Sequence, residues 1–211
     1  MLKKIISLLL LSALILTFAG CKDETEESNE TSQPREFAIG KVENNVYSNT
    51  FIGIKIILDS SWTFHSEDEI KALNNQTADM INDDEYLEKI QQADTIYDMY
   101  ASKKNGTNVI VTLDKVTPDK KADYFDDAMK AELRTTYTKM RFSNVNIEDR
   151  ETLIDGELYK GLAISATADG QTYIQQRSIA VDCGDYMAVI AISGLSSGEI
   201  ETIIDCIDRL L

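Results

Sequence analysis

Residues 94–116, DTIYDMYASKKNGTNVIVTLDKV, decide the fold. Both halves of this stretch are rich in β-branched and aromatic residues, which favour strands. Between them stands Asn105-Gly106, a strong signal for a two-residue hairpin turn because both residues tolerate positive φ. The second half is apolar at every second position, which predicts a buried face made of Val109, Val111 and Leu113. The sequence therefore predicts an antiparallel hairpin with one side in the core.

Strand and turn signals continue through the second half of the chain. From Val145 onward, Asp155-Gly156 and Asp169-Gly170 separate three predicted strands, and Cys183-Gly184 begins the turn into a fourth. Residues 186–192 are apolar at both parities, which indicates a central strand covered on both faces. Tight turns join antiparallel neighbours, because parallel strands need long crossovers.

Helical patterns flank these strands. Ser66 and Glu69 have the spacing of a capping box, and apolar residues follow at helical period: Ile70, Leu73, Thr77 and Met80. A second short helix is predicted from Asp83. Thr117-Pro118 predicts the start of a long helix with the stripe Ala122, Phe125, Met129, Leu133, Thr136 and Met140. A last helix is predicted over 196–211 with the stripe Ile200, Ile203, Ile204, Ile207 and Leu211.

A first hairpin precedes these elements, because Asn44-Asn45 is turn-prone and residues 51–58 favour a strand whose core face is Ile52, Ile54 and Ile56. The element order is thus hairpin, helices, hairpin, helix, meander, helix. Helices on an antiparallel sheet make a layered α+β domain, so we predict a central antiparallel sheet of about 6–8 strands flanked by helices.

Residues 49–70, NTFIGIKIILDSSWTFHSEDEI, resemble the start of the PsbP-like family, in which a strand runs into a turn that ends in Trp before the first helix. This chain departs from the pattern at Asp59-Ser60-Ser61, where relatives usually carry a Pro before the Trp. By element order the resemblance covers residues 40–211 and implies the PsbP-like layered sandwich. That fold is shared by many bacterial lipoproteins, a photosystem II extrinsic subunit and a Ran-binding nuclear import factor. The family shares no catalytic residues, so the resemblance assigns none here.

Residues 1–20 have the charge order of an export signal, with Lys3 and Lys4 ahead of the apolar run 5–18. As a helix this run would be about 21 Å long, shorter than the roughly 30 Å hydrocarbon core of a membrane. We therefore predict a signal peptide, with a short transmembrane anchor as the alternative.

The signal ends in Phe18-Ala19-Gly20-Cys21, which resembles the lipobox of bacterial lipoproteins with Phe18 in place of the usual Leu. In that family the Cys sulfur receives a diacylglyceryl group and the leader is cut before the Cys. The resemblance thus implies that Cys21 is lipidated and begins the mature protein, which would be held on the outer face of the bacterial cytoplasmic membrane. The alternative is a free or disulfide-bonded Cys21.

Residues 21–36 are predicted to form a disordered acidic tether, because after Cys21 they include six acids and no apolar residue to bury. Residues 37–211 suit a single α+β domain with its own core. The whole chain has a net charge of −15, and loss of residues 1–20, with two lysines and no acid, leaves −17. Such a charge repels phosphate backbones, so we expect no nucleic-acid partner.

Several side chains are candidates for catalytic or metal-binding groups. Gly194-Leu195-Ser196-Ser197-Gly198 matches the nucleophile elbow of serine hydrolases, but no His follows it, and we expect Ser196 to cap the last helix with Glu199. The lone His65 is expected to be a surface or packing residue. The acidic clusters, 83–85 and Asp123, Asp126 and Asp127, lack the oxygen spacing of a calcium loop and are expected to charge helix starts.

Two cysteines remain in the predicted domain, Cys183 and Cys206, and we expect two separate thiols, with a disulfide as the alternative. Trp62 is expected to pack under the first helix. Tyr97 and Tyr100 are expected on opposite faces of one strand, with Tyr100 or Tyr173 available for an exposed patch. Tyrosine suits such recognition surfaces.

The sequence thus predicts a non-enzymatic binding or accessory module, anchored to the membrane through an N-terminal lipid. Its partner is expected to be an envelope or extracellular protein or a small ligand, and no catalytic, cofactor or metal residue is predicted. The alternative is an envelope-associated hydrolase that uses carboxylates or Ser196.

Overall fold

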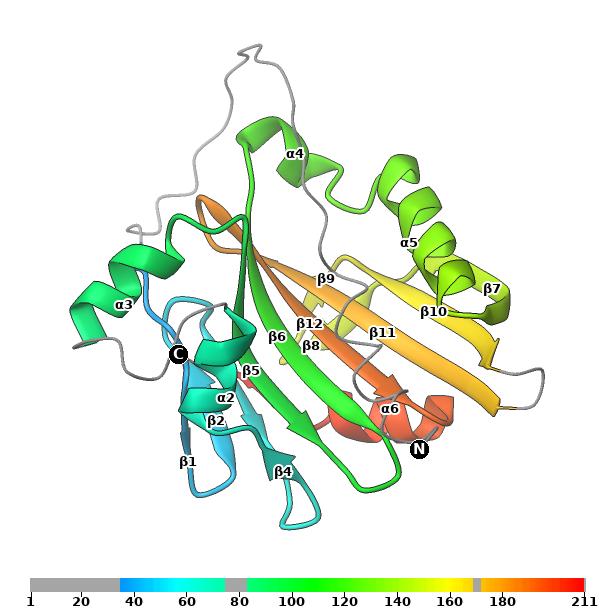
Figure 1. Ribbon diagram of the computed structural model, residues 1–211, viewed down its shortest axis with the longest axis horizontal. Coiled ribbons are helices and arrows are strands. Elements are labelled where there is room, and N and C mark those ends of the chain that lie inside the picture. The colour runs from blue at the N-terminus through cyan, green and yellow to red at the C-terminus, as the bar shows by residue number, and fades with distance from the viewer. Residues whose placement is uncertain (1–34, 75–82, 169–171, 211) are drawn as a thin grey trace.

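The computed structural model describes residues 35–74, 83–168 and 172–210 (Figure 1). The predicted signal peptide, the lipidation site Cys21 and the tether up to residue 34 lie outside the described residues, as do Thr77, Met80 and Asp169-Gly170.

The described chain is built on one large antiparallel sheet. It has seven strands in the order β4-β5-β6-β12-β11-β10-β7, and all neighbours pair antiparallel. The strands are β4 Thr63–Phe64, β5 Thr95–Ser102, β6 Asn108–Lys115, β7 Phe142–Asp149, β10 Gly161–Ala168, β11 Thr172–Asp182 and β12 Tyr186–Gly194. Every residue of β12, the middle strand, is buried. The α+β class, the strand number and the central position of β12 are therefore confirmed.

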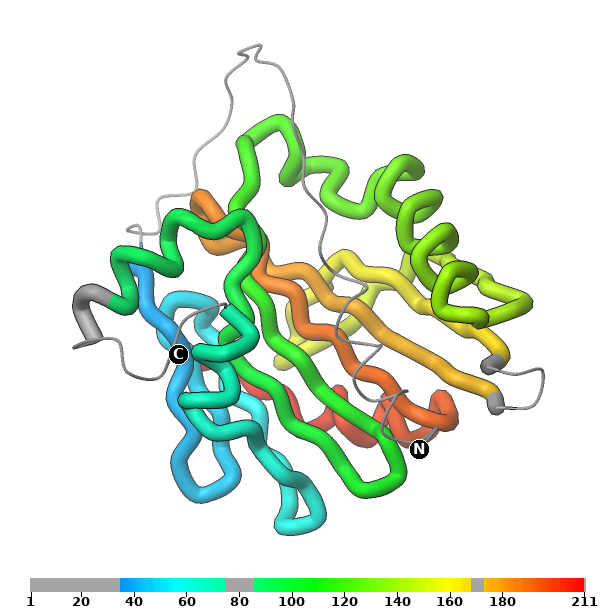
Figure 2. The backbone as a smooth tube through the Cα atoms, viewed as in Figure 1, coloured from blue at the N-terminus to red at the C-terminus, as the bar shows by residue number. Residues whose placement is uncertain are grey.

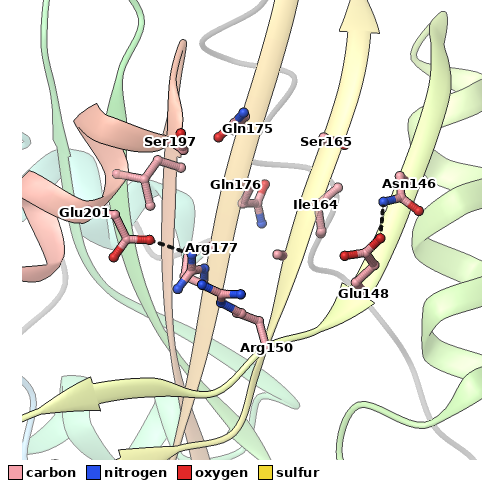
Figure 3. A pocket seen from close by; sticks show the side chains of 12 residues that line it. Asn146, Glu148, Arg150, Ile164, Ser165, Gln175, Gln176, Arg177, Ser197 and Glu201 are labelled. Carbon is pink, nitrogen blue, oxygen red and sulfur yellow. Dashed lines mark hydrogen bonds and ion pairs between the residues drawn. The ribbon is translucent and has the colours of Figure 1, made fainter.

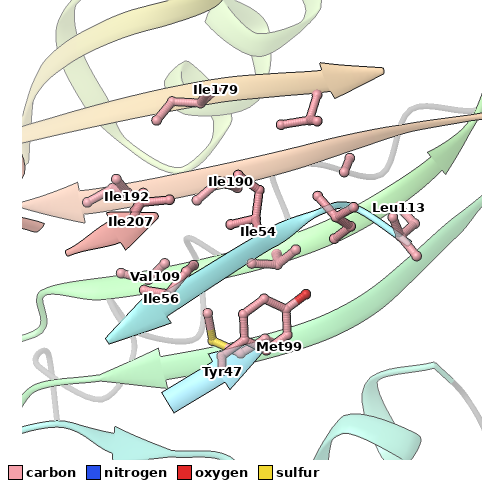
Figure 4. Packing of buried hydrophobic residues seen from close by; sticks show 14 of the residues in the cluster. Tyr47, Ile54, Ile56, Met99, Val109, Leu113, Ile179, Ile190, Ile192 and Ile207 are labelled. Atoms are coloured by element: carbon pink, nitrogen blue, oxygen red, sulfur yellow. The ribbon is translucent and has the colours of Figure 1, made fainter. Parts of the chain in front are cut away.

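A second sheet packs against one face of the first. Its order is β1-β2-β3-β13, with β1 Lys41–Glu43, β2 Val46–Asn49, β3 Ile54–Ile57 and β13 Ile207–Arg209. Figure 4 shows Tyr47, Ile54 and Ile56 of this sheet directed at Met99, Val109 and Ile190 of the large one. The predicted apolar faces of β3 and β6 meet here, and together they form the main hydrophobic core.

The five described helices lie on both sides of the large sheet (Figure 1). They are α2 Glu67–Leu73, α3 Asp83–Ile90, α4 Pro118–Ala122, α5 Asp127–Lys139 and α6 Ser197–Ile204. The apolar residues of α5 cover β7, β10 and the start of β11, and those of α2 cover β5 and β6 on the same face. The apolar residues of α6 face the other way, into the main core beside the second sheet.

A β-bulge in β5 overturns the expectation for its tyrosines. The register with β6 shifts between Tyr97 and Met99, so Asp98 turns inward and Tyr97 and Tyr100 end on one face. Both tyrosines are buried against α2, with 8% and 5% of their surface exposed. The prediction that Trp62 packs under the first helix is also wrong. Trp62 packs in the main core, on the face away from α2, with Lys103 Nζ over its ring.

The predicted long helix after Thr117-Pro118 is two helices. Its first turn, α4, has Pro118 at its start, and the chain then breaks so that Asp126 caps α5 by accepting a hydrogen bond from Met129 N at 2.7 Å. The side chains that α5 buries are Met129, Leu133 and Tyr137.

The predicted last helix is also too long. It ends at Ile204, and Ile207 to Arg209 form β13 instead, pairing with β3. Figure 2 shows this C-terminal segment running from α6 to the second sheet. Pairing satisfies the open backbone groups of β3, which a continued helix would leave without partners.

The predicted turns at Asn44-Asn45, Asn105-Gly106 and Asp155-Gly156 are present, but the one at Asn105-Gly106 is not the expected two-residue turn. Asn44-Asn45 and Asp155-Gly156 take positive φ and close tight hairpins. The Asn105-Gly106 loop is longer, because only Gly106 has positive φ and Lys103 N donates to Thr107 O across it. The prediction that Asp155-Gly156 joins two strands of the meander is wrong in one respect. The strands on either side of it, β8 Thr152–Ile154 and β9 Glu157–Tyr159, form a separate two-stranded sheet.

Candidate functional site

Ser196 and His65, the candidate nucleophile and base, do not lie close together. Ser196 is the N-cap of α6, and its Oγ accepts the Glu199 N–H at 3.2 Å. Glu199 does not complete a capping box, because its carboxylate accepts from Leu195 N and from Thr107 Oγ1. His65 lies on the opposite face of the sheet, its ring 4.1 Å from that of Tyr100. Burial lowers the pKa of His65, and the Glu69 carboxylate offsets part of that shift.

Neither remaining cysteine is bonded to another described residue. Cys183 is buried and Cys206 half-buried, both as free thiols, so the disulfide alternative is wrong. Burial raises the pKa of the Cys183 thiol to about 11, which keeps it in the unreactive thiol form.

Among residues 35–74, 83–168 and 172–210, no three His, Cys, Asp or Glu side chains are grouped as metal ligands. None of the helices in those ranges is long and apolar enough to span a membrane.

A polar groove lies on the outer half of the large sheet, on the face that carries α6 (Figure 3). It arises because the main core covers this face only from β5 to the inner part of β11. The groove has a volume of about 240 Å³. The lining residues are Asn146 and Glu148 of β7, Arg150 just after it, Ala163 and Ser165 of β10, Gln175 and Arg177 of β11, and Ser197, Ile200 and Glu201 of α6. We call this feature the sheet groove.

Arg177 is the deepest charged group of the sheet groove. Only 8% of its surface is exposed. One guanidinium nitrogen, Nη1, donates to Thr152 Oγ1 at 3.1 Å, and Nη2 donates to Glu201 at 2.8 Å. The third, Nε, is buried without a hydrogen-bond partner among the described residues. The guanidinium thus has one buried N–H donor, on Nε, without an acceptor, beside the two hydrogen bonds that Nη1 and Nη2 make.

The rim of the sheet groove carries a second arginine and a second acid. Arg150 is exposed at the end of β7, and Figure 3 shows it close to Arg177. Glu148 accepts a hydrogen bond from Asn146 Nδ2 at 2.7 Å. The groove therefore contains two guanidinium groups and two carboxylates, one of which, Glu201, is already paired. It is suited to a polar ligand with an acidic group.

Two carboxyl groups with a raised pKa lie outside the groove, Asp98 buried and Asp114 half-buried. Asp98, between the two sheets, accepts hydrogen bonds from Tyr47 Oη, from Asn49 Nδ2 at 2.7 Å and from Gly40 N at 2.7 Å. Burial raises the Asp98 pKa, and these hydrogen bonds offset part of the shift. Asp114, at the end of β6, accepts from the Tyr124 hydroxyl, and burial raises the Asp114 pKa to about 6. Each acid holds a connecting segment on a sheet, which is a structural role.

The sequence analysis predicted no site at the sheet groove, and it named only Ser197 and Ile200 of its lining, in other roles. One available signal was the run Gln175-Gln176-Arg177, three polar side chains in the middle of a strand whose neighbours are apolar. A charge at a central strand position implies either a partner or a ligand, because an isolated buried charge is costly. The same signal marks Asp98 in the apolar stretch TIYDMYA.

The similarity of this chain to known proteins lies at the level of solved structures. No protein-family model matches it, and no curated protein sequence matches it. Among solved structures, it is similar to cyanobacterial PsbP (CyanoP) from Synechocystis, with 12% identity, a TM-score of 0.46, and coverage of 85% of this chain and 98% of that one.

Two further structures are similar over most of this chain. One is a protein of Bacteroides thetaiotaomicron, with 12% identity, a TM-score of 0.39, and coverage of 80% of this chain and 49% of that one. The other is LpqN of Mycobacterium tuberculosis, described as involved in cell envelope biogenesis, with 9% identity, a TM-score of 0.36, and coverage of 72% and 76%.

Proposed function

We propose that this protein is a lipid-anchored, non-enzymatic binding module on the outer face of a bacterial cytoplasmic membrane, and that the sheet groove binds its ligand. The anchoring part rests on the sequence, in which an export signal ends at Cys21 and an acidic tether follows. The binding part rests on one observation, the buried Arg177 whose Nε has no partner among the described residues.

The ligand class follows from the groups in the groove. Guanidinium forks pair with carboxylate and phosphate oxygens, and both Arg177 and Arg150 lie there. Glu148, Gln175 and Ser165 add acceptors and donors for hydroxyl or amide groups. We therefore expect a small polar ligand that carries a carboxylate or phosphate group. The acidic body of the protein repels such an ion elsewhere, so binding is expected to be confined to this groove.

Binding without catalysis is proposed because the groups available for chemistry lie elsewhere. Ser196 is engaged as a helix cap, and the carboxyl groups whose pKa is raised, Asp98 and Asp114, are each held by a tyrosine hydroxyl outside the groove. Glu201, the acid of the groove nearest to Arg177, is already engaged in an ion pair with it at 2.8 Å.

The experiment is a ligand titration of the purified protein with inorganic phosphate, succinate and glycerol, followed by thermal unfolding and isothermal calorimetry. Phosphate or succinate is expected to raise the melting temperature, and glycerol, which carries no charge, is not. Arg150→Gln should weaken binding at least about tenfold, since a charged hydrogen bond is worth about 1.5–3 kcal/mol. Arg134→Gln, on an exposed position of α5, is the matched control. Equal anion affinities of the Arg150→Gln and Arg134→Gln variants would refute the binding site. The absence of any response to phosphate and succinate would refute it as well.

The anchor is tested separately by intact-mass spectrometry of protein purified from its native host. Diacylglyceryl-modified Cys21 as the first residue is the expected result. An unmodified thiol at that position would remove the anchoring part of the proposal and leave the groove untouched.

A further inference from the structure

The β8–β9 hairpin holds two leucines in solvent. Leu153 and Leu158 are cross-strand partners, and 61% and 62% of their surfaces are exposed. The other side of the hairpin is fixed to the body, where Thr152 and Ile154 are buried and Tyr159 packs against the main core. A hairpin with one face in contact with solvent normally carries polar residues on that face. Here that face carries a leucine on each strand.

We propose that this leucine pair docks on the phospholipid bilayer to which the chain is anchored, with both side chains inserted at the level of the headgroups. The inference rests on the lipid anchor of the proposed function. It adds a second contact with the membrane, and with it a fixed orientation of the domain.

The first support is where the predicted tether joins the domain. Arg35, the first described residue, donates from Nη1 to Ile52 O at 2.8 Å, beside Gly53. Gly53 O in turn accepts the Leu210 N–H, next to β13. Strand β13 contacts the hairpin directly, because Arg209 N donates to Asp155 Oδ2 at 2.7 Å.

The second support is the length of chain between Cys21 and Arg35. As the coil that its composition predicts, this segment has an expected end-to-end distance of about 20 Å. A lipid on Cys21 therefore keeps the tether's junction, and the hairpin beside it, within reach of the bilayer surface. The tether cannot cover the leucines itself, since after Cys21 it has no apolar residue before Phe37.

The third support is the local charge. In a chain of net charge −15, the surface around the hairpin is balanced. In the hairpin and its flanks, residues 150–160, Arg150 and Lys160 accompany Glu151, Asp155 and Glu157. Arg209 Nη1 pairs with Glu157 at 2.7 Å, so the opposite charges are equal in number. This part of the domain is therefore repelled less by a lipid surface than the acidic remainder, and docking is expected to be strongest on zwitterionic bilayers.

The test uses the full lipidated chain in phosphatidylcholine vesicles. Trp62 is the only tryptophan, so a Trp62→Phe background allows one reporter at a time. Leu158→Trp places the reporter in the hairpin, where Trp is a favourable strand residue. Leu195→Trp, at an exposed position between β12 and α6, is the matched control on the same tether. Each variant must first show the circular dichroism spectrum and melting temperature of the Trp62→Phe parent.

Lipids brominated near the headgroup are expected to reduce the Leu158→Trp emission at least about twofold and to leave Leu195→Trp unchanged, because interfacial side chains insert about 5–10 Å. Equal quenching of both reporters would overturn the docking. So would the absence of quenching in a chain that still floats with vesicles, and in either case the anchor is unaffected. A chain that does not float with vesicles would remove the anchor and the docking with it. A dimer that Leu153→Ser dissociates, with no quenching, would assign the leucines to self-association instead.

Discussion

We expect the Asp114 carboxyl group to contribute stability that decreases as pH rises, and Asp114→Asn to remove that contribution. The carboxyl group is half-buried at the end of β6, where it accepts a hydrogen bond from Tyr124 Oη. Burial raises its pKa from 3.8 to about 6, so the folded protein binds the proton more tightly than the unfolded chain does. The contribution of the protonated Asp114 to the free energy of unfolding is fully present below about pH 4, and it is lost as pH rises through about 6.

The size of this effect follows from the two pKa values. A change from 3.8 to about 6 corresponds to about 3 kcal/mol of unfolding free energy that is lost between pH 4 and pH 7.5. Asn keeps the shape and can still accept the Tyr124 hydroxyl, but it does not ionise. Asp114→Asn should therefore match the wild type at pH 4 and be more stable by up to about 3 kcal/mol at pH 7.5.

Urea denaturation at both pH values gives the measurement, since other titrating groups cancel in the difference between the two proteins. Tyr124→Phe is a useful companion, because it removes the donor that stabilises the ionised form and should steepen the loss of stability with pH. If the Asp114→Asn and wild-type free energies differ by the same amount at pH 4 and pH 7.5, the reasoning about Asp114 is wrong.

Three further changes test other parts of the structure. Asp98→Asn should destabilise by about 2–3 kcal/mol in urea denaturation, the opposite sign to Asp114, because an amide replaces an acceptor that three donors share. A Cβ on Gly161 would lie 2.0 Å from Ser178 O, so Gly161→Ala should cost about 3 kcal/mol or more, and a neutral result would contradict the close strand approach. Ser196→Ala should cost about 1 kcal/mol, as for a lost helix cap, and a panel of ester substrates should show no loss of hydrolysis with it. Destabilisation near zero would show that the Ser196 cap contributes nothing.

The sequence predicted the elements that depend on local chemistry. The hairpin around Gly106, the buried middle strand β12 and the capping box of Ser66 and Glu69 are all present. Each follows from residues within a few positions of one another, where turn, cap and alternation rules apply.

What the sequence did not predict depends on partners far along the chain. Alternation placed Tyr97 and Tyr100 on opposite faces, but the bulge that turns Asp98 toward Tyr47 and Asn49 places them together. Ile207 continues the apolar stripe of a helix, but the open edge of β3 takes it into a strand. In both cases a backbone or a buried polar group about 50 or more residues away decides the local structure, and periodicity does not contain that information.

The sheet groove also depends on residues far apart in the sequence. Comparing Gln175 with Arg177 distinguishes a ligand site from a sheet face that is only exposed to solvent. The four short strands of the second sheet, with α6, cover the large sheet only as far as the inner part of β11, so the outer part of that face must be polar whatever the protein does. A face that only meets water would carry side chains such as Gln175, which stays half-exposed. Arg177, two residues along on the same face, is instead drawn down to 8% exposure and held on both sides by Thr152 and Glu201. Burying a guanidinium with Nε unpaired costs stability that a solvated surface has no reason to carry, and an acceptor from a ligand would offset it.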